Sequence, residues 1–292
     1  MENGNTDCDQ AIYHFLETQL QLFRGYFLIT QASMEEEAIH QMRVAIKRIR
    51  AIRKLKKHIN FPSLLDDEQY AAIKTIFAVS GQMRDLQIQR NLLKGYINDL
   101  NFTFDDLAAH LEELENQLLE TFRQTIQTLD FNQFNEVARI AEPLDGQEDR
   151  INLEKESVDF LHKKIGKINE LILLMDKDEF VHALRKQIKQ LYFILQFIKK
   201  HFPKNELTQY KLKALKNIGE HIGNWNDRDV FLNRIDGFFG SKDDKFPEGN
   251  AEYPVLYSRL EDEKVTILNG IKPELNIELT NLKTLLSNNN NK

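Results

Sequence analysis

Apolar residues recur at helical spacing along nearly the whole chain. The segments AIYHFLETQLQLFRGYFLI (11–29) and LAAHLEELENQLLETFRQTIQTL (107–129) both place them three or four positions apart. Sustained alternation of apolar and polar residues, which is typical of strands, does not occur between turn signals. We therefore predict an all-α protein built from long antiparallel helices.

Breaks between helices are predicted where polar, Gly and Pro residues interrupt this spacing. They fall at Thr30–Ser33, Phe61–Ser63, Gly81, 98–106, 142–150, Pro203 and 240–254, the last being the longest loop candidate. Ser33 with Glu36 has the pattern of a capping box at the start of a helix. Asp176 or Asp178 is suited to the N-cap of a later helix.

The chain contains an internal repeat. The segment IHQMRVAIK (39–47) resembles VHALRKQIK (181–189), and KTIFAVSGQMRD (74–85) resembles KNIGEHIGNWND (216–227). Six residues match at one offset of 142: His40 with His182, Arg43 with Arg185, Lys47 with Lys189, Lys74 with Lys216, Gly81 with Gly223 and Asp85 with Asp227. We predict two similar helical halves, residues 1–145 and 146–292.

The first copy of the repeat lies in an unusually basic helix. At about 100° per residue, five titratable side chains share one stripe about 80° wide. They are His40, Arg43, Lys47, Arg50 and Lys54. Apolar residues border the stripe on both sides, whereas a solvated helix face is broad and mixed in sign. This pattern favours a basic wall inside a groove between helices.

The second copy repeats this stripe with less charge. His182, Arg185 and Lys189 keep their places, but Tyr192 replaces Arg50 and Gln196 replaces Lys54. We expect the second half to form the weaker side of a shared site.

Clustered cations repel one another unless carboxylates or an anionic ligand compensate them. A structural ion-pair network is one interpretation, and the histidines suit buried, hydrogen-bonded positions as well as ligand contacts. Two matching stripes favour a shared anion site, because Arg forks onto phosphate oxygens and Lys supplies a mobile point charge.

The overall composition is that of an acidic globular protein. The formal net charge is −6, which argues against a general nucleic-acid coat, and one cysteine, Cys8, fits a reducing compartment. The first ten residues have no apolar region of a signal peptide, and the longest apolar run, LILLM (171–175), is too short to span a membrane. We expect a cytoplasmic protein without membrane segments.

The pattern H-x-x-R-x-x-x-K-x-x-R, present at His40, Arg43, Lys47 and Arg50, resembles the CHAD family, the conserved-histidine α-helical domain. The second copy and the segments Gly81–Asp85 and Gly223–Asp227 resemble it too, so the resemblance spans nearly the whole chain. It implies two four-helix bundles related by a pseudo-two-fold axis, and a basic channel that binds inorganic polyphosphate. The binding residues it implies, with Lys54 added from the stripe, are His40, Arg43, Lys47, Arg50, Lys54, Lys74, His182, Arg185, Lys189 and Lys216.

The other residues of the repeat are interpreted as structural. Asp85 and Asp227 suit N-caps or a partner for Arg84, and no acidic cluster with metal-ligand spacing accompanies them. Gly81 and Gly223 suit helix ends or close helix contacts. Trp225, the only tryptophan, suits packing.

The favoured function is therefore non-catalytic binding of polyphosphate, with no cofactor and with polyphosphate granules as an expected location. The alternatives are an enzyme that processes polyphosphate or phosphate esters, an RNA-binding protein and a binder of small phosphorylated ligands. The chain has no E-x-E-x-K motif of a triphosphatase and no nucleotide-binding P-loop, and aromatic residues for base stacking are few in the first stripe. The oligomeric state does not follow from the sequence.

Overall fold

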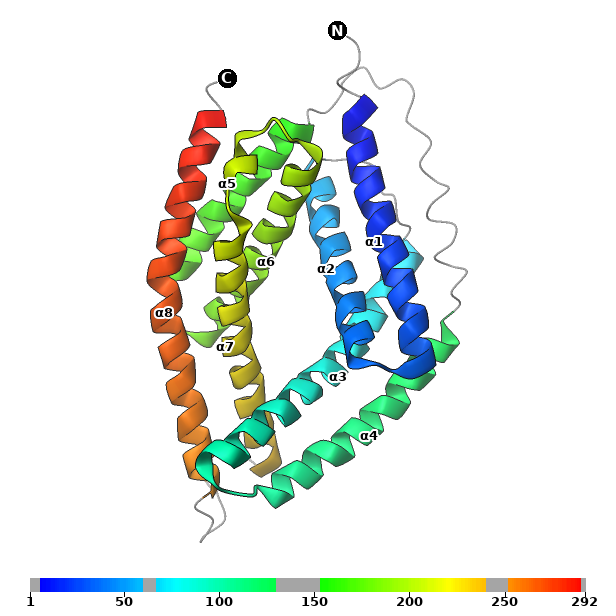
Figure 1. The fold of residues 1–292 in the computed structure, drawn as a ribbon, viewed down its shortest axis with the longest axis vertical. Coiled ribbons are helices and arrows are strands. Elements are labelled where there is room, and N and C mark those ends of the chain that lie inside the picture. The colour runs from blue at the N-terminus through cyan, green and yellow to red at the C-terminus, as the bar shows by residue number, and fades with distance from the viewer. Residues whose placement is uncertain (1–5, 60–66, 130–152, 240–251, 290–292) are drawn as a thin grey trace.

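The computed structural model describes residues 6–59, 67–129, 153–239 and 252–289 (Figure 1). These residues form eight α-helices and one short 3₁₀ helix, and no strand occurs among them, so the all-α prediction is confirmed. The helices are α1 (Thr6–Ser33), α2 (Glu36–His58), α3 (Asp67–Leu100), α4 (Asp105–Thr128), α5 (Leu153–Ile172), α6 (Asp178–His201), α7 (Leu212–Phe239) and α8 (Glu252–Asn289), with η3 at Glu206–Gln209.

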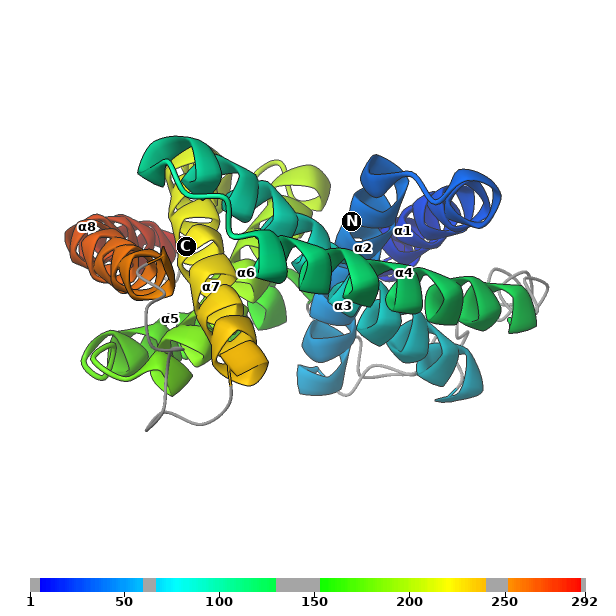
Figure 2. The same cartoon turned by 90° about the horizontal axis from the view of Figure 1, so that it is seen from below.

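Consecutive helices pack in pairs, α1 with α2, α3 with α4, α5 with α6 and α7 with α8. The pairs meet in the middle of the molecule, where α2 contacts α6 and α3 contacts α7. Figures 1 and 2 show α1 and α2 on one side and α7 and α8 on the other. The four helices that carry the sequence repeat, α2, α3, α6 and α7, thus all take part in the contacts across the centre.

The repeat is visible in the helix bounds, since Asp178 begins α6 and lies 142 residues after Glu36, which begins α2. The predicted division of the chain near residue 145 lies outside the described residues. The two-fold relation of the two halves stays a prediction.

The core explains why the basic helix is stable despite its charge. Ile39, Met42, Ile46 and Ile49 of α2 are spaced by three or four residues and are fully buried. The main hydrophobic cluster joins side chains from both predicted halves, and a smaller cluster joins α3 and α4 to α7 and α8. Burial of one face of α2 leaves its basic stripe to face the centre.

The predicted helix caps are wrong. Ser33 is still part of α1, and its hydroxyl donates to the carbonyl of Ile29 at 3.0 Å. The helix ends because Met34 adopts a left-handed conformation with φ 55°, and α2 then starts after Glu35 without a side-chain cap. Likewise, Lys177 holds the N-cap position of α6, and Asp178 is its first residue.

The predicted breaks at 98–106 and near Pro203 are confirmed, because α3 ends at Leu100 and α6 at His201. The break predicted at Gly81 is wrong, since α3 runs through it, as α7 runs through Gly223. The predicted breaks at 61–63 and 142–150, and most of the one at 240–254, lie outside the described residues.

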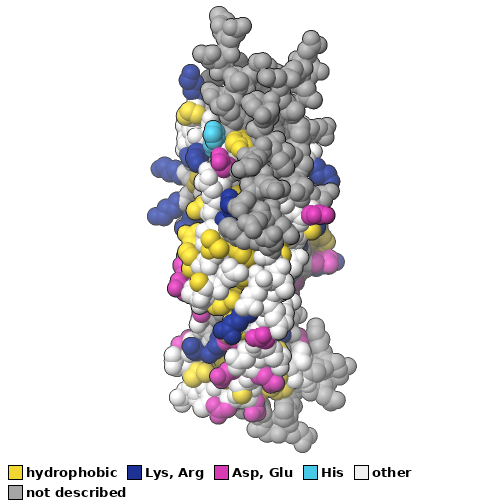
Figure 3. Space-filling view, turned by 90° about the vertical axis from the view of Figure 1, so that its right-hand side faces the viewer, with side chains coloured by type: hydrophobic (Ala, Val, Ile, Leu, Met, Phe, Trp, Pro, Cys, Tyr) yellow, Lys and Arg dark blue, Asp and Glu magenta, His cyan; other side chains and the backbone are white. Residues whose placement is uncertain are grey.

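The described helices contain no stretch that is both long and apolar enough to cross a membrane. On the face shown in Figure 3, lysines and arginines occur together with acidic side chains, which gather toward the lower end. This face is therefore mixed in sign.

Candidate functional site

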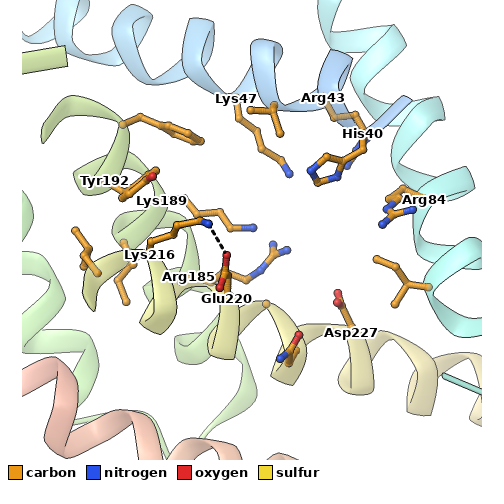
Figure 4. Close-up of a pocket in the computed structure, with 18 of the residues that line it drawn as sticks. His40, Arg43, Lys47, Arg84, Arg185, Lys189, Tyr192, Lys216, Glu220 and Asp227 are labelled. Carbon is orange, nitrogen blue, oxygen red and sulfur yellow. Dashed lines mark ion pairs between the residues drawn. The ribbon is translucent and has the colours of Figure 1, made fainter. Parts of the chain in front are cut away.

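A cavity of about 360 Å³ lies where α2, α3, α6 and α7 meet (Figure 4). Its charged or titratable lining side chains are His40, Arg43, Lys47, Arg84, Asp85, Arg185, Lys189, Lys216, Glu220 and Asp227. Six are lysines or arginines and three are carboxylates, so the lining is net positive in a protein that is net negative. Apolar side chains and Tyr192 complete the walls.

The structure brings both basic stripes to this cavity. His40, Arg43 and Lys47 point into it from α2, and Arg185 and Lys189 from α6 (Figure 4). Lys216 also lines it from α7. Six of the ten predicted binding residues therefore lie around one space.

Arg43 is held in place by α3. Its Nη1 donates to the carbonyl of Phe77 at 2.6 Å and to the hydroxyl of Ser80 at 3.0 Å, and its guanidinium lies 4.4 Å from the centre of the Phe77 ring. A Cβ at Gly81 would stand only 3.0 Å from the same Nη1. The predicted close contact at Gly81 is thus real, and the glycine leaves room for the guanidinium.

Three cavity cations lack such partners. Within the described residues, Lys47 and Lys189 make no hydrogen bond or ion pair, and the buried Nε of Arg185 has no hydrogen-bond partner. All three side chains are half-buried. Because water does not fully solvate them and no carboxylate pairs with them, these cations are available to an anionic ligand.

The pKa values of the two lysines reflect this environment. Burial, followed by the charges of Arg185 and Lys47, lowers the pKa of Lys189 to about 6. Burial, followed by Arg43 and Arg185, lowers the pKa of Lys47 to about 8. Burial and then Arg84 also lower the pKa of His40. The cavity therefore disfavours the charged forms of its own basic side chains.

Asp85 and Asp227 line the cavity from the middle of α3 and α7, so their interpretation as N-caps is wrong. Burial raises the pKa of each carboxyl group, and nearby cations, Arg43 for Asp85 and Arg185 for Asp227, oppose that rise. Within the described residues neither carboxylate lies within ion-pair distance of a cation, and Asp227 only accepts a 3.4 Å hydrogen bond from Asn226. Asp85 and Asp227 thus face the same space as the cations without forming an ion pair with them.

The remaining charges at the cavity are partly compensated. Lys216 forms an ion pair of 3.3 Å with Glu220 one turn along α7, and both side chains are more than half exposed. Arg84 lies 3.4 Å from Glu36 and also donates to Gln87. Sequence reasoning treated Arg84 only as a partner of Asp85 and missed its place in the lining, because its counterpart in the repeat is the neutral Asn226.

His182 lies outside the cavity lining, unlike His40. Its Nε2 donates to a carboxylate oxygen of Asp229 at 2.8 Å, and the ammonium group of Lys264 donates to the other oxygen at 2.7 Å. Burial alone would raise the pKa of Asp229, but the hydrogen bonds from His182 and Lys264 outweigh it and lower that pKa to about 2. The His182 and Lys264 side chains both contact the buried Trp225, whose predicted packing role is confirmed.

Arg50, Lys54 and Lys74 also lie outside the cavity lining. Arg50 stacks on Phe77 at 4.6 Å from the ring centre. The ammonium group of Lys74 lies 5.3 Å from the centre of the Tyr70 ring. Lys54 and Lys74 are exposed. The stripe on α2 is therefore longer than the cavity.

This arrangement can hold an anion with several charged groups. Two unpaired lysines and an arginine converge from two helices, and the anchored Arg43 adds a rigid guanidinium. Within the described ranges, no group of three or more His, Cys, Asp or Glu side chains is arranged to hold a metal ion.

Comparison with known proteins agrees with this architecture. The family model of the CHAD domain matches residues 15–236. Among solved structures, the crystal structure of the CHAD domain from the plant Ricinus communis matches with a TM-score of 0.62 and 18% sequence identity, over 92% of this chain and 91% of that chain. The comparison with curated proteins finds no match. The chain belongs to the CHAD domain family, and the resemblance stated from its motifs is confirmed.

Proposed function

We propose that this protein binds inorganic polyphosphate in the central cavity without chemical turnover. The observation that carries the proposal is the set of unpaired, half-buried cations, Lys47, Arg185 and Lys189, that meet in one cavity from α2 and α6. Of the other predicted binding residues, His40, Arg43 and Lys216 line the same cavity, whereas Arg50, Lys54 and Lys74 lie outside its lining. The tenth, His182, supports α6 through its bond to Asp229 rather than contacting the ligand.

The energetics favour a strongly anionic ligand. Burying cations without partners costs free energy in the empty protein, and a phosphate group between them offsets that cost. Each lysine and arginine can donate charge-assisted hydrogen bonds to phosphate oxygens, which are about twice as strong as neutral ones. Relief of this free-energy cost on binding adds to the affinity for the ligand.

Polyphosphate fits better than the other phosphate ligands. A bare phosphate chain has no bases or sugars, so a narrow cavity with charged and apolar walls suffices to recognise it. An RNA site instead needs aromatic platforms, and Tyr192 and Phe193 are the only aromatic residues in the lining. Membership of the CHAD family supports polyphosphate as well, because that is the ligand the resemblance implies.

We also propose that binding is not followed by hydrolysis. Metal-assisted phosphoryl chemistry uses carboxylates gathered around Mg²⁺. The three carboxylates of the described lining, Asp85, Glu220 and Asp227, instead share it with six lysines and arginines, and Glu220 is paired with Lys216. Release of phosphate from long-chain polyphosphate by the pure protein, lost on Asp85→Asn, would overturn this part of the proposal. A cytoplasmic location on polyphosphate granules remains part of the same proposal.

The binding test uses titration calorimetry with long-chain polyphosphate at several salt concentrations. Six to eight phosphate contacts predict a slope of log K against log salt of roughly −4 to −6. The double variant Lys47→Gln/Lys189→Gln should bind at least about 100-fold more weakly, since each lost charged hydrogen bond costs about 1.5–3 kcal/mol.

The matched control removes the same charge elsewhere. Lys272 and Lys283 are exposed on α8 and lie outside the cavity lining, so Lys272→Gln/Lys283→Gln should bind like the unchanged protein. Single-stranded RNA of equal charge should bind more weakly than polyphosphate. Equal loss in both double variants, or equal affinity for RNA, would contradict a dedicated polyphosphate cavity.

A further inference from the structure

The basic stripe of α2 continues beyond the cavity. Arg50 and Lys54 follow Lys47 by one and two helical turns and lie where the second half of α2 packs against α5. The rings of His58 and Phe160 mark this contact, with centres 5.3 Å apart. The end of the stripe is therefore next to α5 as well as α3.

Two more lysines join the stripe at this place. Lys164 of α5 donates from its ammonium group to the side chain of Gln187 at 2.9 Å, which brings it beside α6, where Lys186 is exposed. After burial, Arg50 and then Lys186 lower the pKa of Lys54, and Lys54 in turn lowers that of Lys164. We call Arg50, Lys54, Lys164 and Lys186 the basic exit.

These four cations have no acidic partners. In the parts of the chain that the structure describes, none of them forms an ion pair with a carboxylate. Arg50 only stacks on Phe77, and Lys164 bonds only to a neutral amide and lies 5.0 Å from the Phe160 ring. Four charges from three helices are thus left without a carboxylate partner in the described part of the chain.

The basic exit is connected to the cavity through one ring. Arg43, which lines the cavity, and Arg50, which belongs to the exit, both stack on Phe77, at 4.4 Å and 4.6 Å from its centre. The charge of Arg50 also contributes to the lowered pKa of Arg43. A phosphate chain leaving the cavity beside Arg43 would meet Arg50 next.

The four cations of the basic exit are not repeated at the offset of 142. At the offset of 142, the counterparts of the four exit residues are Tyr192, Gln196, Leu22 and Val44, none of which is charged. Gln196 donates to the hydroxyl of Tyr192 at 2.9 Å, so these two side chains satisfy each other. The repeat supplies the cavity from both sides, but the four exit cations have uncharged counterparts.

We propose that the basic exit is a second phosphate subsite, so that the protein prefers chains long enough to occupy the cavity and the exit together. This inference rests on the proposed function of the cavity. A chain that spans both subsites binds the second one at high effective concentration, whereas a short oligomer gains only the cavity contacts. The chain leaves the cavity past Arg50 and not past Tyr192.

The experiment compares tripolyphosphate with long-chain polyphosphate. The variant Lys54→Gln/Lys186→Gln removes two exposed exit charges with little risk to folding, and Lys272→Gln/Lys283→Gln on α8 is the control. In the exit variant, the salt slope for the long chain should become shallower by about one to one and a half units, with a loss of affinity of about tenfold at low salt. Its affinity for tripolyphosphate should stay within about twofold, because that ligand uses the cavity alone.

The outcomes separate this inference from the function on which it rests. Unchanged affinity and slope of the exit variant for the long chain would overturn the second subsite and leave the cavity as the binding site. An equal loss for both ligands would also overturn it, because the exit would then not be a separate subsite. If the unchanged protein binds neither ligand, the proposed function itself fails, and the inference fails with it.

Discussion

Helices α2 and α6 carry the same three basic or titratable residues but place them in different surroundings. On α2, His40, Arg43 and Lys47 all face the cavity, and the stripe continues as Arg50 and Lys54. On α6, Arg185 and Lys189 face the cavity, but the stripe ends in neutral Tyr192 and Gln196. The first half thus contributes more of the charge that an anion can reach.

The two histidines of the repeat differ in their partners. His182 bonds to Asp229, which also holds the buried Lys264, and Lys264 bonds in turn to Asp178. At the offset of 142, the counterpart of Asp229 is Gln87, and nearby cations, Arg84 first among them, lower the pKa of His40 further than burial alone. His182 is thus part of a structural ion network, whereas His40 lines the cavity.

The largest effect is expected from breaking that network. Asp229→Asn removes the carboxylate between His182 and the buried Lys264, and losing one partner of a buried ion pair costs about 3–5 kcal/mol. Urea unfolding should show this loss in the free energy of unfolding. The double variant Asp229→Asn/Lys264→Met should recover much of it, because no charge is left buried alone.

The counterpart position serves as the control for this comparison. Gln87→Ala should cost less, about 1–2 kcal/mol, because Gln87 accepts only one 3.3 Å bond, from Arg84. Equal losses at Asp229 and Gln87 would show that the two halves are not as different as their contacts indicate.

The next effect is a pH dependence of binding. The pKa of Lys189 is about 6 and that of Lys47 about 8 in the empty cavity, and a bound phosphate raises both. Binding therefore takes up protons, and affinity should be highest below pH 6 and fall as pH rises, by up to about tenfold per pH unit for each titrating group. Calorimetry in buffers of different ionisation enthalpy measures this uptake directly.

The variant Lys189→Met sharpens the same comparison. In the unfolded chain a lysine keeps its proton up to about pH 10.4. Between pH 6 and 10, Lys189 is therefore protonated in the unfolded chain but neutral in the folded protein, and folding releases a proton. The stability of the ligand-free protein accordingly rises with pH in that window. Lys189→Met should flatten this rise, stabilise the ligand-free protein by roughly 0.5–2 kcal/mol and weaken binding. Loss of stability in this variant would contradict the unpaired state of Lys189.

A smaller change is expected at the cavity carboxylates. Asp85 and Asp227 face the same cations as the ligand does, so Asp85→Asn/Asp227→Asn should increase affinity for polyphosphate roughly tenfold, equivalent to about 1.4 kcal/mol. Titrations in EDTA exclude metal bridges. Weaker binding by this variant in EDTA would show that the carboxylates help to hold the ligand.

The smallest effect is expected at Gly81. A Cβ there would push on the Arg43 guanidinium at 3.0 Å, so Gly81→Ala should weaken binding by about three- to tenfold, or roughly 1 kcal/mol. Gly95→Ala, in the same helix with nothing within 4 Å, should instead stabilise the protein by about 0.5–1 kcal/mol and leave binding unchanged. Equal binding by the two variants would show that Gly81 does not make room for the Arg43 guanidinium.

The sequence was informative wherever periodicity decides the structure. Helical spacing of Ile39, Met42 and Ile46 predicts both the helix and its buried face, and the offset of 142 predicts which helices share the site. The sequence was misleading where one residue type can have two structural roles. Gly81 looked like a break but serves a close approach, and Asp85 looked like a cap but faces the cavity. His182 could not be placed, because its partner Asp229 has the neutral Gln87 as counterpart in the repeat. Lys264, the second partner of Asp229, lies outside the repeat.

The central claim is that the unpaired cations of the cavity receive the phosphate, and nuclear magnetic resonance of the lysine side chains tests it most directly. The pKa of Lys189 is followed with and without long-chain polyphosphate, and its signal is assigned with Lys189→Met. In the absence of ligand we expect a pKa of about 6. Saturating polyphosphate should raise that pKa by about two units or more, while the signals of Lys272 and Lys283 stay unchanged. An unchanged pKa of Lys189 under saturating polyphosphate would contradict the account.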